Sequence, residues 1–391
     1  MAHINVLRSA TMKIIIVNSL YYPYKFGGAE VSVQLLAEGL VARGITVKVI
    51  TLNNKKEIER FNHNGVEVVS FPLRNIYWPF DKTNYTKIKK AIWHVRDYLK
   101  NPIVEMVQKE ISNDNPDIIH TNNLAGFSVG IWDLAEDIKS PLIHTTRDYY
   151  LFHPNSTLFK NGANMDINNS FVKSYSWYKK KKSQKIDAMV GISKYISDLH
   201  KENGFAGKAT HTHIYNPIEK VNIRKKACNK LTIGFLGRLT TEKGFDVFIE
   251  YAVKYKNNFN FIAAGDFAST SNSDVLRKDA INCGIVLKGF IPIDELFSEV
   301  DVLLLPTKWN EPFGRVVAEA AVSGIPVFAN LTGGIKEISE KFPWVKDIRD
   351  FNAESINLLF KGTIHEVSNP FDKSKITDEY LSLYSKVLKE Q

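Results

Sequence analysis

The sequence contains little cysteine, with Cys228 and Cys283 as the two in 391 residues. Small secreted scaffolds depend on many paired cysteines, so that class is excluded, and two scattered thiols are typical of a reducing compartment. No apolar run approaches the roughly 18 residues of a membrane-spanning helix, and the apolar cluster at 14–17 is too short for a signal peptide. We therefore expect a cytoplasmic protein, with Met12 as its start and residues 1–11 as an unstructured leader.

The composition also lacks the extremes of disordered and fibrous chains. Hydrophobic residues make up 44% of the sequence and charged residues 24%, which is ordinary for a folded globular protein. A chain of 391 residues is long enough for two domains, each with its own hydrophobic core.

The charge is uneven along the chain. Residues 1–226 hold 32 lysines and arginines against 20 acids, and residues 227–391 hold 19 against 22, so the net charge of +9 comes from the first part. Such an excess suits nucleic acid, an anionic membrane surface or an anionic substrate, and it can also serve solubility alone. The four lysines at 179–182, after the aromatic residues at 175–178, are the segment that we consider for an anionic membrane surface.

Short apolar segments alternate with amphipathic ones along the chain. We expect strands at 13–18, 46–51, 66–70, 117–120, 141–145, 187–191, 231–236, 259–264, 284–288, 301–305 and 325–329. We expect helices at 28–43, 84–112 (with a break at Pro102), 243–256, 272–282, 292–299, 314–323 and 376–390. Continuously apolar strands are typical of parallel sheets covered on both faces, and the alternation predicts an α/β fold with doubly wound domains.

The alternation is interrupted at 215–230, a polar and basic stretch without periodicity. We therefore predict two Rossmann-like domains, at 1–215 and 216–375, followed by a last helix at about 376–391. Two such domains leave a cleft between them, and α/β sheets bind their ligands at the carboxyl ends of the strands.

The first candidate motif is Gly27-Gly28-Ala29-Glu30, which follows the first expected strand and opens the first expected helix. Glycine lets a backbone approach a ligand closely, and the amides of a helix N-terminus attract anions. The segment is therefore a candidate phosphate site, and a plain loop-to-helix junction is the alternative.

A second candidate phosphate site follows the strand at 231–236. Arg238 comes directly after this strand and its glycine, and Lys243 lies at the start of the next helix. Arginine binds phosphate oxygens in pairs, and lysine adds a point charge. The two cations suit a diphosphate, and two solvated surface residues are the alternative.

The most specific segment is PTKWNEPFGRVVAEAAVSG at 306–324. Glu311 lies in a turn before Gly314, and Glu319 lies in the helix that follows, a little over two helical turns later. Carboxylates accept paired hydrogen bonds from sugar and ribose hydroxyls. A glycosidase pair is disfavoured, because its carboxylates flank the scissile bond from opposite sides, whereas these come from one turn and one helix.

Polar side chains also crowd the end of the expected strand at 141–145. His144, Arg147 and Asp148 lie there within five residues. Such groups can orient a ligand or transfer a proton, and a salt-linked loop is the structural alternative.

These segments resemble those of the retaining glycosyltransferases of family 4, which have the GT-B fold. The resemblance rests on GGAE at 27–30, on FLGRLTTEKGFD at 235–246, and on DVLLLPT at 301–307 running into EPFGRVVAEAAVSGIPV at 311–327. It implies two Rossmann-like domains that face each other across a cleft. The N-terminal domain would bind the acceptor, the C-terminal domain would bind a nucleoside-diphosphate sugar, and the last helix would cross back to the first domain.

The resemblance also implies roles for individual residues. Arg238 and Lys243 would neutralise the donor diphosphate and Glu311 would contact the transferred sugar, so these three are the catalytic candidates. Glu319 would bind the ribose hydroxyls. The remaining donor-site candidates would act through their backbone or by close approach, and they are Gly27, Gly28, Leu287, Phe313 and Gly314.

One position departs from the family pattern. Many relatives have a His-Asp pair where this chain has Arg147-Asp148, with His144 three residues earlier, so either Arg147 or His144 could take the place of the usual histidine. The resemblance implies transfer of a hexose with retention of anomeric configuration, no metal and no cofactor, with a UDP-sugar as the donor we expect. Cations and helix amides would stabilise the leaving diphosphate.

The implied partners are the nucleotide-sugar donor and a saccharide or lipid-linked acceptor, in cell-surface polysaccharide or glycolipid biosynthesis. A peripheral position on the inner face of the membrane stays open. A GT-B epimerase of sugar nucleotides or a phosphorylase would have similar phosphate-binding parts. A nucleic-acid-binding protein would use the basic part of the chain, but no zinc spacing, recognition helix or aromatic platform motif accompanies the charge, so we expect no nucleic acid.

Overall fold

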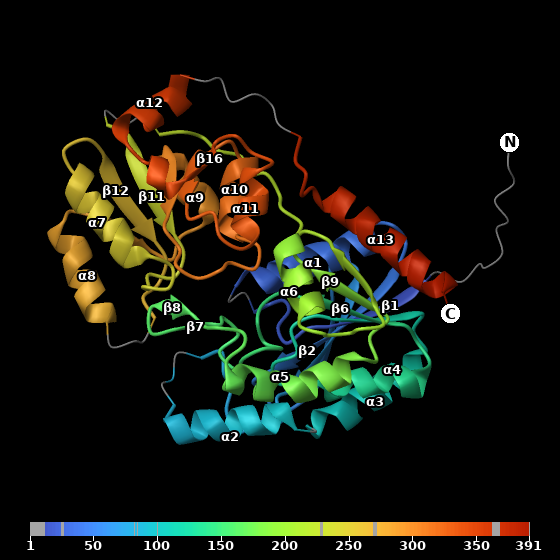
Figure 1. The fold of residues 1–391 in the computed structure, drawn as a ribbon. Coiled ribbons are helices and arrows are strands. Elements are labelled where there is room, and N and C mark those ends of the chain that lie inside the picture. The colour runs from blue at the N-terminus through green and yellow to red at the C-terminus, as the bar shows by residue number, and fades with distance from the viewer. Residues whose placement is uncertain are drawn as a thin grey trace, which may run out of the picture.

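The structure, a computed structural model, describes residues 12–24, 27–81, 83, 85–99, 101–226, 230–268, 272–361 and 368–390. Two sheets, each packed against helices, form two domains, the first at lower right and the second at upper left in Figure 1. This arrangement confirms the predicted α/β class. The expected leader at 1–11, Cys228 and part of the expected linker lie outside the described residues.

The first sheet has eight strands in the order β10-β9-β6-β5-β1-β2-β4-β3, and all neighbours are parallel except β3 and β4. Its strands are β1 (Lys13–Val17), β2 (Thr46–Asn53), β3 (Glu59–His63), β4 (Val66–Pro72), β5 (Ile118–Thr121), β6 (Leu142–Thr146), β9 (Ala188–Gly191) and β10 (Thr210–His213). Successive side chains of β1 serve opposite faces: Ile14 and Ile16 belong to one buried cluster, Ile15 and Val17 to another. A continuously apolar strand results because both faces are covered.

The helices of the first domain cover the two faces of this sheet. They are α1 (Gly28–Val41), α2 (Lys87–Tyr98), α3 (Ile103–Asp114), α4 (Asp133–Ile138), α5 (Ser170–Ser183) and α6 (Lys194–Glu202), with a 3-10 turn at η1 (Val129–Trp132). A small hairpin of β7 (Phe159–Lys160) and β8 (Ala163–Asn164) projects from the domain. The break expected within 84–112 is present, because α2 ends at Tyr98 and α3 begins at Ile103. Pro102, which has no amide proton to donate, stands directly before α3.

The apolar pattern does not predict the edge strands β3 and β10. Their sequences, ERFNH and THTH, are polar, and their residues are half-buried or exposed. A strand at the edge of a sheet has one neighbour and faces solvent, so a polar sequence is compatible with it. Helix α5 is also missed, because its sequence, SFVKSYSWYKKKKS, lacks a clear apolar period.

The second sheet is fully parallel, in the order β13-β12-β11-β14-β15-β16. Its strands are β11 (Thr232–Leu236), β12 (Asn260–Ala264), β13 (Val286–Gly289), β14 (Val302–Leu305), β15 (Val327–Ala329) and β16 (Val345–Asp347). Its helices are α7 (Phe245–Tyr255), α8 (Ser273–Asn282), α9 (Ile293–Glu299), α10 (Arg315–Val322), α11 (Gly334–Ser339) and α12 (Ala353–Lys361), with a 3-10 turn at η2 (Ile348–Asp350).

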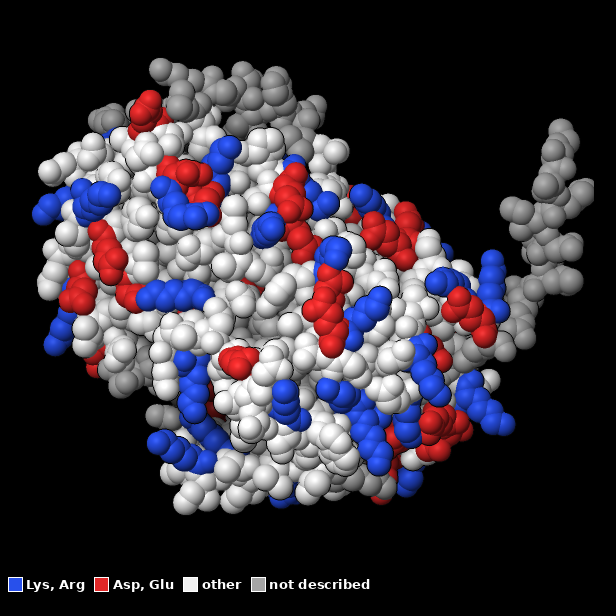
Figure 2. Space-filling view, viewed as in Figure 1, with Lys and Arg blue, Asp and Glu red and all other residues white. Residues whose placement is uncertain are grey.

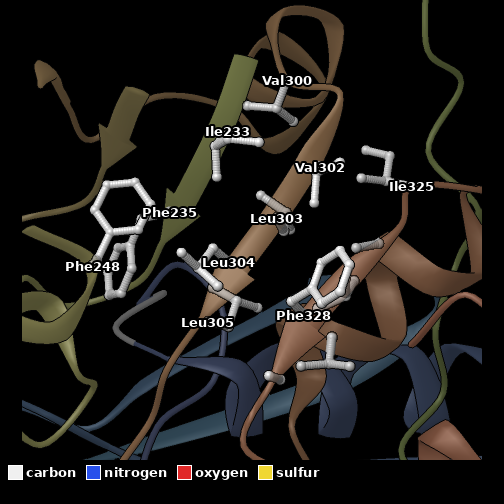
Figure 3. Packing of buried hydrophobic residues seen from close by; sticks show 14 of the residues in the cluster. Ile233, Phe235, Phe248, Val300, Val302, Leu303, Leu304, Leu305, Ile325 and Phe328 are labelled. Atoms are coloured by element: carbon white, nitrogen blue, oxygen red, sulfur yellow. The ribbon is translucent and has the colours of Figure 1, made fainter. Parts of the chain in front are cut away.

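The core of the second domain lies along β11 and β14. Figure 3 shows their apolar side chains between Phe248 of α7 and Phe328 of β15. The rings of Phe235 and Phe248 lie 5.3 Å apart. This packing holds the carboxyl ends of β11 and β14, where the candidate cations and carboxylates begin, in a fixed relation.

The last helix, α13 (Lys373–Lys389), follows the second domain in sequence but lies against the first (Figure 1). The hydroxyl of Tyr384 lies 2.7 Å from Nδ1 of His120 on β5, and the hydroxyl of Tyr380 lies 3.1 Å from Oγ1 of Thr145 on β6. The chain therefore passes between the domains twice. The boundary that we place at 215–216 stays a prediction.

Among the described residues we find no helix with both the length and the apolar content needed to span a bilayer. The lysines at 179–182 do not form a continuous cationic patch. Lys179 is buried and donates to the Tyr150 carbonyl at 2.8 Å, and this burial lowers its pKa. Lys182 pairs with Asp133 at 2.6 Å. Lys179 and Lys182 are therefore engaged within the protein and are not free to contact an anionic membrane surface.

Candidate functional site

Two ion pairs stand where the second sheet faces the first domain. The first joins Lys243, in the loop between β11 and α7, to Glu311, in the loop after β14. Both side chains are mostly buried, and the Lys243 ammonium lies 4.7 Å from the centre of the Trp309 ring. The Glu311 carbonyl accepts from the Gly334 amide at 2.8 Å, which ties the loop to the start of α11. Residues 68 positions apart are thus brought together at the carboxyl ends of two strands.

The second pair joins Arg315 to Glu319 within α10, with 2.7 Å between Nε and Oε1. Burial raises the pKa of Glu319, and the neighbouring Arg315 acts in the opposite direction. Arg315 also donates to Ser32 Oγ of α1 at 2.8 Å and to the Pro217 carbonyl at 3.1 Å. The arginine therefore connects the candidate ribose-binding carboxylate with the first domain.

Arg315 was not among the residues predicted from the sequence. A cation one turn before Glu319, inside the most specific segment, was the available signal. Its contacts with Ser32 and Pro217 join distant parts of the chain, so no local sequence pattern predicts them.

The turn before α10 depends on its glycine. Gly314 has φ of +93°, and a Cβ at this position would lie 2.6 Å from Ile335. Phe313 is buried in the core of the second domain. Leu287, on β13, is half-buried against the same core. These three candidates thus shape the site through the backbone and packing.

Arg238 stands apart from the two ion pairs. Its guanidinium pairs with Glu242, and about half of its side chain is exposed (55%). It follows the carboxyl end of β11, where Gly237 and Gly265 approach each other so closely that a Cβ at Gly265 would clash with the Gly237 carbonyl. Arg238 is therefore accessible to a ligand that reaches the end of β11.

The N-terminus of α1 is partly occupied by its own chain. The Gly27 amide donates to the Glu30 carboxylate at 3.0 Å. Burial raises the pKa of Glu30, and the amide bonds act in the opposite direction. A Cβ at Gly28 would lie 2.7 Å from Cδ of Arg315, while one at Gly27 would meet only Glu30, at 3.5 Å. Gly28 is thus needed for the close approach of the two domains.

His144 and Arg147 both border a small cavity at the carboxyl ends of β5 and β6. His144 is engaged within the first domain, with Nδ1 2.9 Å from Thr121 Oγ1 and its ring 5.0 Å from that of Trp132. Burial lowers the pKa of His144 well below its usual range. The imidazole is therefore neutral and held by its neighbours.

Arg147 is buried among amide oxygens. Its Nε donates to Asn122 at 2.9 Å, and a terminal nitrogen donates to Asn216 at 2.6 Å. No carboxylate of the described residues forms an ion pair with it. Burial lowers the pKa of Arg147 and raises the pKa of Asp148 to about 6. The Asp148 carboxylate accepts from the Tyr150 amide at 2.7 Å, so Arg147 and Asp148 do not form the salt-linked loop considered as the alternative.

The loop that carries Glu311 is bound to the first domain by contacts that the sequence did not predict. The Tyr149 hydroxyl donates to the Asn310 carbonyl at 2.5 Å, and Ser193 donates to the Pro312 carbonyl at 2.6 Å. In Figure 1 the β7–β8 hairpin reaches toward the second domain, and there Asn164 exchanges hydrogen bonds with the backbone at 308 and 310, both of 3.0 Å. Trp309 is buried with the first domain's core.

Glu337 of α11 adds a further contact between the domains. Its carboxylate accepts from the Lys194 and Tyr195 amides at the start of α6, both at 2.8 Å. A carboxylate at a helix N-terminus is electrostatically favourable. The candidate carboxylates of the second domain therefore stand in a fixed position opposite the first.

Comparison with known protein families identifies the family to which this chain belongs. Residues 26–220 match the model described as Glycosyltransferase Family 4, and residues 218–358 match the model described as Glycosyl transferases group 1. The chain belongs to the glycosyltransferases. The matches cover both domains and confirm that the chain is a glycosyltransferase, as expected from the sequence motifs. They do not favour the epimerase, phosphorylase or nucleic-acid-binding alternatives.

Two curated relatives align with most of the chain, and one of them is named a glycosyltransferase. The glycosyltransferase is 41% identical over 377 residues to a Klebsiella pneumoniae protein described as an uncharacterized 42.6 kDa protein in the cps region, covering 95% of this chain and 100% of that one. It is 27% identical over 353 residues to an uncharacterized glycosyltransferase of Methanocaldococcus jannaschii, covering 84% and 82% of the two chains.

Solved structures share the GT-B fold. The Anabaena protein HepE, solved in complex with UDP-glucose, aligns with a TM-score of 0.67 at 17% identity, covering 96% of this chain and 100% of that one. The sucrose-phosphate synthase of Thermosynechococcus elongatus aligns with a TM-score of 0.66 at 16% identity, covering 97% and 100%. At such identities the likeness establishes the fold, and it confirms the expected GT-B architecture.

Proposed function

We propose that this glycosyltransferase moves a hexose from a nucleoside-diphosphate sugar to an acceptor hydroxyl with retention of anomeric configuration. The observation that carries the proposal is the pair of buried contacts Lys243–Glu311 and Arg315–Glu319, placed at the carboxyl edge of the second sheet opposite α1. Cations for phosphates and carboxylates for hydroxyls thus lie side by side. The HepE complex with UDP-glucose supports a UDP-sugar as the donor.

The donor diphosphate is the group that needs cations. Negative charge develops on it as the sugar leaves, and preorganised cations stabilise that charge. In our proposal Lys243 exchanges Glu311 for a phosphate oxygen, while Arg238 turns from Glu242 to the same diphosphate. Glu311, released from Lys243, accepts hydrogen bonds from the sugar hydroxyls. The protein thereby supplies the positive charge itself, so we propose a metal-independent reaction without a cofactor.

The remaining donor-site residues have supporting roles in this proposal. Glu319 accepts from the ribose hydroxyls, with Arg315 opposing the effect of burial on the pKa of this carboxyl. The other positions let backbone come close to the donor, and they are Gly27, Gly28, Leu287, Phe313 and Gly314.

Arg147 is our candidate for the position at which relatives carry histidine. His144 is held by Thr121 and Trp132, whereas Arg147 carries a buried positive charge whose described partners are neutral amides. Such a cation beside the cavity at the ends of β5 and β6 would bind an anionic or strongly polar group of the transferred sugar or the acceptor.

The cps-region relative supports a role in cell-surface polysaccharide or glycolipid biosynthesis. We therefore propose a saccharide or lipid-linked acceptor on the cytoplasmic side, with the enzyme acting at the inner face of the membrane.

Thermal unfolding with UDP, GDP, ADP and their sugar conjugates tests the donor site. A ligand at about 100 times its Kd stabilises the protein by about 2.7 kcal/mol, which raises Tm by several degrees. We expect a shift with the UDP compounds that is lost in Arg238→Ala and Glu319→Ala and retained in Arg349→Ala, a control at an exposed arginine of the same domain. No shift with any nucleotide would contradict the proposal. NMR of the product's anomeric proton would test retention.

A further inference from the structure

Helix α2 carries an apolar stripe that faces solvent. Ile88, Ile92 and Val95 on the helix, and Leu99 directly after it, are 73%, 46%, 57% and 55% exposed. Their spacing of four, three and four residues places them on one side of a helix. The buried residues of α2, Trp93 and Asp97, lie on the opposite side. A helix on the surface of a globular protein normally turns its apolar stripe inward. Packing of the core therefore does not account for this exposed stripe.

The charges around the stripe have one sign. Lys87, Lys89, Lys90 and Arg96 are exposed on α2. Lys89 and Arg96 flank the stripe on one side, by the same helical geometry. The acid of this helix, Asp97, is buried, where it accepts from the Gly126 amide at 2.6 Å and the Tyr150 hydroxyl at 2.8 Å. The exposed surface of α2 is therefore apolar and cationic.

Helix α5 lies beside α2 and extends the same character. The rings of Tyr98 and Tyr178 lie 5.1 Å apart and link the two helices. Helix α5 contains no acid and exposes Phe171 and Trp177, together with the lysines at 173 and 181. Figure 1 places both helices along the lower side of the first domain, and in Figure 2 the surface at the lower edge, where α2 runs, is white and blue.

We propose that α2 and α5 form a membrane-docking face that rests on a bilayer with anionic headgroups. Amphipathic helices with large apolar side chains and flanking lysines bind in this way, through apolar burial and attraction to anionic lipids. A second copy of the chain is disfavoured as the occupant, because two faces without exposed acids on these helices would repel each other. The binding itself does not depend on glycosyl transfer, although it would bring a lipid-linked acceptor to the proposed site.

Flotation of the full-length protein with vesicles tests this face. One set of vesicles contains phosphatidylcholine alone, and the other contains equal parts of phosphatidylcholine and phosphatidylglycerol. We expect binding to the anionic vesicles that weakens with added salt. A variant with Ile88, Ile92, Val95 and Leu99 all changed to Ser should bind about 100-fold less. Lys89→Glu with Arg96→Glu should lower binding at least about 25-fold, since each cation near such a surface contributes about fivefold.

Matched variants on the second domain serve as controls. Val253, Val275 and Ile281 are similarly exposed on α7 and α8, and changing them to Ser should leave vesicle binding unchanged. Lys254→Glu with Lys278→Glu is the matched charge control. Circular dichroism and Tm of every variant exclude misfolding as the cause of a loss.

Three results would overturn the proposal. The first is absence of wild-type binding to anionic vesicles, and the second is equal loss in the α2 variants and their controls. The third is a dimer in light scattering that the Ser variant dissociates, with vesicle binding unchanged, which would assign the stripe to a second copy. Vesicle binding is measured without nucleotide and nucleotide binding without vesicles, so failure here is distinguishable from failure of the proposed function.

Discussion

The two domains hold their candidate polar groups in different ways. In the second domain cations and carboxylates are paired, as in Lys243–Glu311 and Arg315–Glu319. In the first domain Arg147 is buried with two amide oxygens as partners, and the half-buried Asp148 accepts from a backbone amide. A paired site is electrostatically balanced before a ligand arrives, whereas an unpaired buried charge is costly unless a ligand compensates it.

This difference assigns different tasks to the two sides of the site. The paired groups can exchange partners when a donor brings both phosphates and hydroxyls. The unpaired groups favour a ligand that is itself charged or strongly polar. Four predictions would sharpen or break this contrast, and they run from the largest expected effect to the smallest.

Lys243→Ala tests the paired side. We expect kcat at saturating donor to fall by about 10²–10³, because a preorganised charge that faces the leaving group contributes this much. Lys254→Ala, at an exposed lysine of α7, is the control and should retain normal turnover. A near-normal kcat of the Lys243→Ala enzyme would show that this lysine is not a catalytic residue.

Arg147→Met tests the unpaired side. We expect transfer to fall by about 10² through loss of one preorganised donor group, while the nucleotide-induced thermal shift stays as in the wild type, because the nucleotide is held by the other domain. Initial rates and thermal shifts on the same preparation separate the two effects. Loss of both the nucleotide-induced thermal shift and the activity would show that Arg147 is needed for nucleotide binding as well as for transfer.

Asp148→Asn tests the burial of a carboxylate. Its folded-state pKa is about 6, raised from 3.8 by burial, so the folded protein binds the proton more tightly than the unfolded chain. The resulting contribution to stability is present below about pH 4 and is lost as pH rises through 6. We therefore expect the Asn variant to be more stable than the wild type at pH 7, by up to about 2–3 kcal/mol, with a gap that closes toward pH 4.

Urea unfolding of both proteins across this pH range measures the gap. Asp166→Asn, at an exposed aspartate of the same domain, is the control for the same change of side chain at the surface. A constant gap between Asp148→Asn and the wild type from pH 4 to pH 7 would mean that the carboxyl is not perturbed.

Gly28→Ala tests the place where the two sides meet. The added methyl would lie 2.7 Å from Arg315, so the arginine must move away from Ser32, and we expect a loss of about 1 kcal/mol in stability with weaker nucleotide binding. Gly27→Ala is the matched control for stability, because its methyl would lie 3.5 Å from Glu30. Equal stability of the two variants would show that the close approach at Gly28 is unimportant.

Much of the fold follows from local patterns in the sequence. The central strands are continuously apolar, as at Ile14–Val17, because helices cover both faces of the sheet. The break before α3 follows from Pro102. The edge strands β3 and β10 escape this reasoning, since a polar strand at a sheet edge looks like a loop when the neighbouring strand is unknown.

The sequence by itself determined the α/β class, the glycosyltransferase family and the residue types of the candidate site, because apolar periodicity and compact motifs are local properties. Only the tertiary structure determined which side chains pair with each other. It joined Lys243 to Glu311 and Arg315 to Ser32, buried Lys179 within the lysine run, and turned the apolar stripe of α2 toward solvent. Partners, burial and the resulting pKa values depend on how distant segments pack, and no local pattern contains that information.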